Sequence, residues 1–355
     1  MGKYEANKPL LLTFDYELFF GADSGTAQRC LIEPVNSLLD VLDSAAVKAT
    51  FFIDVLYLWA LKNNFNSSQN CREDYELVED QIKQIIARGH DAQLHIHSHW
   101  LDAEIDLKRN KWVFTYKKYR LHALNNTADS SDILSVSGCV EEGKKILQDI
   151  CRCSKSDYEV FCFRAGGWCL QPFEDLRAAL INNGVTCDSS VLPGYKSSND
   201  DAHYMNYLDA PQLTRWVFDK DVCEVNKQGS FVEVPIPTVK VKNWRLLRNF
   251  LVKRILGGWS KYGDGVGMRF QSPSFNRLKM LVKPFSTQLK YIDLDAYILS
   301  DMKYMIDEID REYEGEGAIV LLGHPKNSSK SSIDTLNRLI HTTGYKFAKS
   351  YRDFL

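Results

Sequence analysis

Residues 9–17, PLLLTFDYE, begin with an apolar run and end with two carboxylates that flank one tyrosine. A short, continuous apolar run predicts a strand that is buried on both faces, which is typical of a parallel sheet covered by helices. Because side chains alternate along a strand, we expect Asp15 and Glu17 on one face and Tyr16 on the other. The stretch therefore predicts a buried strand that carries ionisable groups to its carboxyl end.

The same pattern recurs along the chain. Six further runs predict strands, at 48–55, 90–97, 159–166, 185–191, 230–237 and 318–325. Helix-length amphipathic segments lie between the strands, at 30–45, 75–89, 139–152, 172–184 and 294–313. The alternation predicts an α/β fold, and seven such units favour a distorted, TIM-like (β/α)7–8 barrel over a flat doubly wound sheet. No GxGxxG motif follows the first strand, so a dinucleotide-binding fold is not expected.

Length and composition fit one large barrel. The chain has 355 residues, 45% of them apolar and 25% charged, which excludes a disordered, collagen-like or coiled-coil protein. We expect a single domain over residues 1–355, with insertions at about 100–135 and 240–292 that break the strand–helix period. The chain contains no apolar signal core and no membrane-spanning run, so we expect a cytoplasmic protein whose nine cysteines are reduced, buried thiols.

Charge is unevenly spread along the chain. Twelve lysines and arginines lie between Lys240 and Lys290 against one acid, Asp264, so this segment carries +11 and the rest of the chain −13. A solvated basic face would explain this, and so would peripheral contact of 240–290 with an anionic membrane or a lipid-linked, anionic sugar carrier. No DNA- or RNA-reading motif accompanies the segment, so we expect no nucleic-acid partner.

Ionisable side chains end most of the predicted strands. In barrels of this kind, functional groups lie at the carboxyl ends of the strands. Those ends carry Asp15, Glu17, His95, His97, His99, Arg164, Asp188 and His324. Folding alone would not require so many polar groups at one rim, which therefore predicts an active site.

Four of the eight histidines lie in the segment 90–99. On an extended strand His95 and His99 would be about 13 Å apart, too far to share an ion unless the chain turns after His95. His95 and His97 would share one face while still in the strand. Neutral imidazole is a good ligand for zinc and similar ions, so either pair predicts a metal site.

The remaining polar groups have roles that suit hydrolysis. One carboxylate at the end of the first strand can bind the metal ion, while the other accepts a proton from water. Arg164 can fix and ionise one of these carboxylates. His324 follows four apolar residues and a glycine, and could act as a general acid.

Five motifs resemble, in their order and rough spacing, those of the polysaccharide deacetylase family (NodB homology, family 4 carbohydrate esterases). They are TFDYE (13–17), GHDAQLHIHSH (89–99), FRAGGW (163–168), CDSSVLPG (187–194) and VLLGHP (320–325). The resemblance covers about residues 8–200 and 316–326, and the second motif is its most specific part. Two positions depart from the family: Tyr16 stands where a second Asp is usual, and no proline follows Arg164.

The resemblance implies a distorted (β/α) barrel and metal-dependent removal of an N-acetyl group from a sugar or glycan, in cell-surface polysaccharide biosynthesis. It implies one divalent ion, with zinc as the first expectation and other first-row ions open. The catalytic residues it implies are Asp15 as base, Arg164 orienting that base and His324 as acid. The metal ligands we expect are His95, His99 and Glu17 (or Asp15), with His97 as a further candidate. We expect the substrate, an N-acetylated sugar or lipid-linked glycan, to contact Tyr16, Trp100, Trp168 and Asp188.

Two other functions remain open. The HIH segment at 95–97 superficially resembles the HxH pair of metal-dependent phosphoesterases and amidohydrolases, although these usually carry it on the first strand. Tyr16 would also suit a catalytically inactive, glycan-binding protein on the same scaffold.

Overall fold

One eight-stranded sheet organises the chain. The computed structural model describes residues 8–199, 203–268, 283–342 and 344–355. The strand order is β10-β11-β7-β6-β3-β2-β1-β14, and every pair is parallel except β10–β11 at one edge. The strands are β1 (Leu10–Tyr16), β2 (Ala49–Asp54), β3 (Asp91–Ile96), β6 (Cys162–Ala165), β7 (Cys187–Asp188), β10 (Trp216–Phe218), β11 (Phe231–Glu233) and β14 (Ile319–Gly323). All seven predicted strands are therefore present, although β7 and β11 are shorter than expected.

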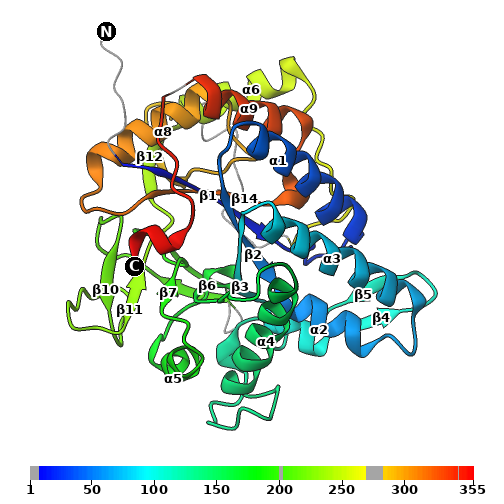
Figure 1. Cartoon of the computed structure of the whole chain (residues 1–355). Coiled ribbons are helices and arrows are strands. Elements are labelled where there is room, and N and C mark those ends of the chain that lie inside the picture. Colours follow the sequence, from blue (N-terminus) through cyan, green and yellow to red (C-terminus); the bar gives the residue numbers. More distant parts are fainter. Residues whose placement is uncertain (1–7, 200–202, 269–282, 343) are drawn as a thin grey trace.

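Helices surround the sheet (Figure 1). They are α1 (Glu33–Ser44), α2 (Val55–Asn63), α3 (Gln69–Ala87), α4 (Val136–Ser154), α5 (Glu174–Asn182), α6 (Asn243–Leu256), α8 (Leu299–Glu312) and α9 (Lys330–Thr342). The five predicted helices correspond to α1, α3, α4, α5 and α8. The inner strands β1, β2 and β3 are buried along their whole length, as expected for a sheet with helices outside and packed side chains within.

The sheet is strongly curled. Arg164 on β6 and Asp15 on β1 are three strands apart in the sheet order, a separation of roughly 14 Å in a flat sheet. Nevertheless, Arg164 NH1 donates to Asp15 Oδ1 at 2.6 Å and to Thr13 Oγ1 at 3.2 Å. The side chains on the inner face of β1 and β6 therefore meet across the concave interior, where the candidate site lies.

The prediction of a closed barrel needs correction. Within the described ranges, no strand of the sheet joins β14 to β10, so the sheet is a curled, open one. A ribbon of β12 (Thr238–Lys242) and β13 (Thr287–Tyr291) follows β11, and Asp293, just after β13, forms a bridge to Leu322 of β14. The short β7 and β11 and the antiparallel β10 hairpin explain why the parallel pattern does not continue around the circle.

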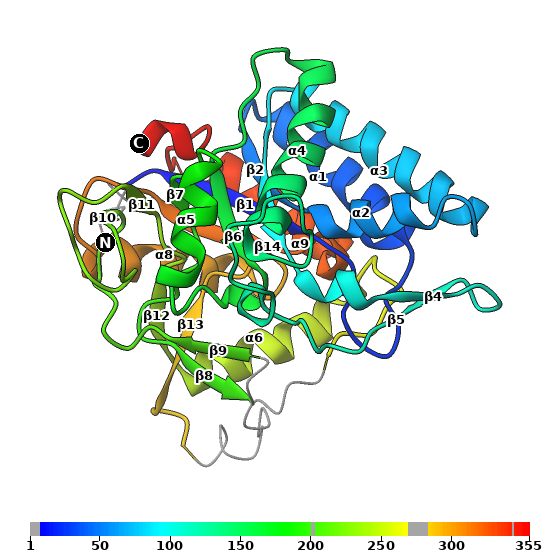
Figure 2. The same ribbon diagram turned by 90° about the horizontal axis from the view of Figure 1, so that it is seen from below.

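The two segments that break the period form smaller structures. The first contains a hairpin of β4 (Glu104–Asp106) and β5 (Lys111–Val113). The second contains β12, α6 and β13, while its residues 269–282 lie outside the described ranges. Figure 2 shows α6 and the β12–β13 ribbon on the same side of the molecule as the hairpin of β8 (Lys196–Asn199) and β9 (His203–Asn206).

The burial of the cysteines and the length of the helices can be compared with the expectations from the sequence. All nine cysteines are free thiols, and seven of them are buried. Cys153 is exposed and Cys223 is half-buried, which corrects the expectation that all nine are buried. Within the described parts of the chain, every helix is too short or too polar to cross a membrane.

Candidate active site

The end of β1 presents its two carboxylates to the interior, as the alternation of a strand requires. Asp15 meets Arg164, and Glu17 meets the histidines of β3. Tyr16 points the opposite way, where its hydroxyl donates to Gln81 Oε1 on α3 at 2.8 Å. Tyr16 is 2% exposed. The expected substrate contact of Tyr16 is therefore wrong, and its position gives no reason to regard the site as disabled.

Glu17, His95 and His97 form a compact group. Glu17 Oε2 lies 3.1 Å from His95 Nε2 and 2.7 Å from His97 Nε2. One ligand atom from each residue lies within 4.8 Å of the others, and all three side chains are buried. His95 comes from β3 and His97 from the residue after the strand ends, so the pair uses the period of two that a strand imposes.

The donor set of this group fits a divalent first-row ion. The Nδ1 atom of His95 lies 2.7 Å from the carbonyl oxygen of Arg164, and a hydrogen bond there makes Nδ1 the protonated nitrogen. The Nε2 lone pair then points at Glu17, an arrangement that a cation or a second proton must stabilise. Two imidazoles and one carboxylate form a donor set that zinc and similar ions accept.

Protonation of the two histidines differs. Burial lowers the pKa of His97 to about 4, even though Glu17 opposes the shift, so the His97 imidazole is neutral at pH 7. Burial also acts to lower the pKa of His95, but the hydrogen bond to Glu17 and the charge of Asp15 outweigh it, and the pKa rises. A metal ion at this group would therefore compete with a proton for the Nε2 atom of His95.

Lys326 is a residue of the site that the sequence did not reveal. Its ammonium donates to Glu17 Oε1 at 2.8 Å and to the Leu18 carbonyl at 2.6 Å. Although burial works against ionisation, the charge of Lys326, together with hydrogen bonds to His95 and His97, holds the pKa of Glu17 well below its usual value. Lys326 comes two residues after His324 in a polar loop, and this sequence context predicts a solvated side chain. Only the structure, in which Lys326 is 6% exposed, identifies it as the partner of Glu17.

Arg164 and Asp15 form the second ion pair of the site. The guanidinium is fully buried, donates to the Ser189 carbonyl and Tyr351 hydroxyl, and lies over the Phe52 ring with Cζ 4.0 Å from its centre. These contacts hold the guanidinium against Asp15, and the role of Arg164 in orienting a catalytic base stays a prediction. We call Asp15, Glu17, Arg164 and Lys326 the charged cluster, in which each carboxylate has a cation of its own.

His324 lies at the open side of the charged cluster. Its Nε2 atom is 3.7 Å from Asp15 Oδ2 and 3.9 Å from Glu17 Oε1. The backbone N–H of His324 donates to Asp295 Oδ2 at 2.6 Å, which anchors the loop that follows β14. Its side chain is 14% exposed, so it can reach both the carboxylates and a bound molecule.

His99 lies outside the Glu17 group. The chain turns after His97 into a short helical turn, Ser98–Asp102, which directs His99 away from His95 rather than back toward it. Its ring lies among aromatic side chains, which we call the aromatic box: Phe20, Trp100, Phe114, Tyr116 and Tyr119. Neither ring nitrogen has a hydrogen-bond partner among the described residues, and burial holds the pKa of His99 well below its usual value.

The other three residues expected to contact the substrate differ in their exposure. Trp100 is fully buried, with its indole N–H on Asp54 Oδ2 at 2.6 Å, and Asp188 is buried against Ser190. Both side chains are buried and bonded within the chain, and their contact with a substrate stays a prediction. Trp168 is half-buried, and its ring meets the Tyr291 ring at a centroid distance of 5.6 Å. Trp168 therefore remains a candidate contact.

No protein-family model matches this chain, and neither does any curated protein sequence. Solved structures similar to it include a protein from Mycobacterium smegmatis assigned as a polysaccharide deacetylase, with 14% identity and a TM-score of 0.43, over 98% of this chain and 89% of the other. The peptidoglycan N-acetylglucosamine deacetylase catalytic domain of Eubacterium rectale has 11% identity and a TM-score of 0.34, over 99% and 92%. The 4-α-glucanotransferase of Thermococcus litoralis has 8% identity and a TM-score of 0.48, over 100% and 41%. Polysaccharide deacetylases and family 4 carbohydrate esterases, the family that the sequence motifs resemble, thus occur among the similar structures. At these scores, the argument about function rests on the residues of the site.

Proposed function

We propose that this chain is a metal-dependent hydrolase that removes an N-acetyl group from a sugar or glycan. One observation carries the proposal: the Glu17–His95–His97 group lies beside a carboxylate held by arginine and a partly exposed histidine. Hydrolysis of an amide needs an electrophile, a base and an acid close together, and these residues can supply all three. The sequence motifs that resemble the deacetylase family support the same activity.

Glu17, His95 and His97 would hold the metal ion. A bound divalent ion polarises the amide carbonyl and lowers the pKa of a water molecule. Arg164 occupies Asp15 Oδ1, so Asp15 Oδ2 is the atom that accepts the proton of the attacking water. His324 Nε2, on the other side of Asp15 Oδ2, donates a proton to the leaving amine. The products are acetate and an amino sugar.

The first test is metal content by mass spectrometry on untagged protein. We expect about one equivalent of a first-row metal in the wild type and a loss of it in the His95→Ala/His97→Ala variant. His341→Ala, an exposed histidine on α9, is the matched control and keeps its metal. A wild type that holds no metal after zinc addition and dialysis would contradict the proposal. Acetate release from N-acetylated sugars then tests the reaction.

A second hydrolase class shares the geometry. His95 and His97 converge on one carboxylate, which is also what an HxH phosphoesterase or amidohydrolase needs. Phosphate release from model esters, measured beside acetate release, separates the two classes. The alternative of an inactive, glycan-binding protein rests on Tyr16. Because Tyr16 points away from the site, the structure adds no support for that alternative.

Partners and location remain predictions. An acetylated carbohydrate is the substrate that the proposed reaction requires, with a role in cell-surface polysaccharide synthesis. A cytoplasmic location and peripheral contact of residues 240–290 with an anionic membrane stay untested expectations, and 269–282 of that range lie outside the described residues.

A further inference from the structure

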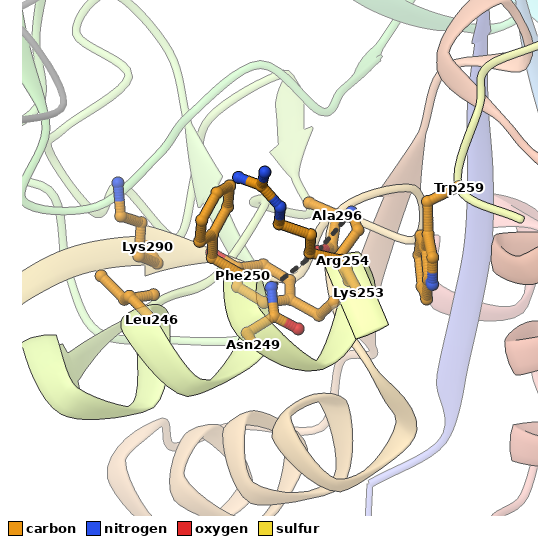
Figure 3. Close-up of a pocket in the computed structure, with 9 residues that line it drawn as sticks. Leu246, Asn249, Phe250, Lys253, Arg254, Trp259, Lys290 and Ala296 are labelled. Atoms are coloured by element: carbon orange, nitrogen blue, oxygen red, sulfur yellow. Dashed lines mark hydrogen bonds between the residues drawn. The ribbon is translucent and has the colours of Figure 1, made fainter. Parts of the chain in front are cut away.

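A concave pocket lies beside α6, in the basic segment that the proposed reaction does not use. Its volume is about 630 Å³, within the range of small-ligand sites. Figure 3 shows Lys290 of β13 at one end and Trp259 at the other, with the side chains of Phe250, Lys253 and Arg254 between them. Asn249 fixes one wall, since its side chain bonds both the Ala296 carbonyl at 2.9 Å and the Ile298 N–H at 2.9 Å.

Three cations line this pocket without carboxylate partners. Within the described residues, Lys253, Arg254 and Lys290 have no carboxylate at ion-pair distance, and Lys253 donates only to the backbone carbonyls of Asp295 and Ala296. Burial lowers the pKa of both lysines; the charges of Asp293 and Asp295 oppose the shift at Lys253, whereas no charge among the described residues opposes it at Lys290. The last turn of a helix favours Lys253 and Arg254, but it does not account for Lys290, which comes from β13.

The other side of the same helix shows the contrast. Arg245 and Arg248 both pair with the buried Asp301 on α8. Among the described residues, Asp301 lies at ion-pair distance where α6 packs against α8, whereas on the pocket side Asp293 and Asp295 act on Lys253 only from beyond that distance. An anion from outside the chain would supply a partner for Arg254 and Lys290.

Aromatic groups complete the pocket. Phe250, Trp259 and Tyr297 line it together with the cations. The Trp259 Nε1 atom is buried and lacks a hydrogen-bond partner in the described part of the chain, and the Trp259 ring lies under Lys253 Nζ, 4.1 Å from the ring centre. Aromatic faces and unpaired cations together suit a sugar or base that carries phosphate.

One segment connects the pocket to the candidate active site. Lys290 lines the pocket, while the next residue, Tyr291, meets Trp168 beside the active site. The carbonyls of Asp295 and Ala296 hold Lys253, and the carboxylate of the same Asp295 holds the His324 backbone. Asp295 therefore lies between Lys253 of the pocket and His324 of the active site, and a molecule that extends past Asp295 would contact both places.

We propose that this pocket binds the phosphate or diphosphate ester of the glycan whose acetamido group reacts at Asp15 and His324. The proposal rests on the proposed deacetylase function and narrows its substrate to a phosphate-activated sugar. Such a sugar could be carried by a nucleotide or a lipid. Leu251, Ile255 and Leu256 are exposed apolar side chains on the same helix, so a lipid diphosphate must be among the probes.

The test is titration calorimetry with inorganic pyrophosphate, N-acetylglucosamine and N-acetylglucosamine 1-phosphate. We expect the two phosphorylated probes to bind at least tenfold more tightly than the neutral sugar. Arg254→Ala/Lys290→Ala should lose at least tenfold of that affinity, because neither side chain has a hydrogen bond in the described structure that its removal would break. Lys240→Ala/Lys242→Ala removes two exposed cations of β12 as the control and should stay within twofold of the wild type.

Equal binding of the neutral and phosphorylated sugars, or wild-type affinity in Arg254→Ala/Lys290→Ala, would overturn the pocket proposal. Pyrophosphate binding to His95→Ala/His97→Ala separates this failure from that of the active site, since that variant keeps the pocket. UDP-N-acetylglucosamine and farnesyl diphosphate then identify the carrier: tighter binding of either one than of pyrophosphate supports the ester and names its source.

Discussion

The charged cluster and the aromatic box lie side by side and are joined by His97. They differ in whether their buried polar groups have partners. In the charged cluster, Arg164 pairs with Asp15 and Lys326 pairs with Glu17. In the aromatic box, His99 is equally buried and has no hydrogen-bond partner among the described residues. The Phe20 ring of the aromatic box also borders the charged cluster, since its centre lies 4.5 Å from the His99 ring centre and 4.6 Å from Lys326 Nζ.

The difference follows from the cost of burial. An ionised group in a dry interior requires an opposite charge, whereas a neutral imidazole loses only its hydrogen bonds to water. The charged cluster is therefore expected to collapse when one partner is removed. The aromatic box should tolerate the loss of its histidine.

Arg164→Met should have the largest effect. It leaves the buried Asp15 without its cation, and we expect a loss of ~4 kcal/mol in the free energy of unfolding. Urea denaturation measures it. Asp15→Asn in the same chain removes the orphaned charge and should restore at least half of the loss. A double variant no more stable than Arg164→Met would show that the other contacts of Arg164, with Ser189, Tyr351 and Phe52, matter more than the charge.

Lys326→Met tests the second ion pair of the charged cluster. We expect a loss of ~3 kcal/mol in metal-free protein, because Glu17 would then lack its ammonium partner. Zinc should reduce this deficit, since an ion bound by Glu17 compensates the same charge and favours the native state. Thermal melts with and without zinc measure the change. Lys330→Met, an exposed lysine on α9, is the control, and a deficit that zinc leaves unchanged would argue against an ion at Glu17.

Strand patterns made much of the fold predictable. Apolar runs predicted β1, β2, β6 and β14 to within a few residues, since strands buried on both faces need such runs. The helix α2 was missed because it starts directly after β2 and is apolar on almost every side, without an amphipathic period. The helix α6 was noted only for its charge, and its apolar side chains at the surface give no clear stripe.

The candidate site was predictable where it depends on strand geometry. Alternation correctly separated Tyr16 from its two acidic neighbours. The sequence allowed two histidine pairs, and only the helical turn after His97 shows which pair faces Glu17. Lys326 could not be predicted, because its burial depends on a contact with a residue more than 300 positions away.

Asp188 and Glu233 extend the comparison to two like charges. They are neighbours across β7 and β11, and burial raises the pKa of Asp188 to about 6 and that of Glu233 well above its usual value. A carboxyl with a raised pKa binds its proton more tightly in the native state, so stability falls as the pH rises from the unfolded to the folded pKa.

Glu233→Gln should therefore become more stable relative to the wild type between pH 5 and pH 8, by roughly 1–2 kcal/mol. Glutamine keeps an oxygen for the Val191 N–H, which Glu233 now accepts at 3.1 Å. Urea denaturation of both proteins at the two pH values gives the difference, in which the other titrating groups cancel. A constant difference would mean that the pair shares no strongly held proton.

His99→Leu should have the smallest effect and most directly tests the aromatic box. Leucine has a similar volume, and it removes two buried nitrogens that no described residue satisfies, so we expect a change of less than about 1 kcal/mol. His97→Leu is the matched comparison, because the same substitution two residues earlier removes a nitrogen that faces Glu17. Metal analysis should find the ion retained in His99→Leu and lost in His97→Leu. If His99→Leu instead loses its metal, the chain must rearrange after His97 when the ion binds. His99 would then belong to the metal site rather than to the aromatic box.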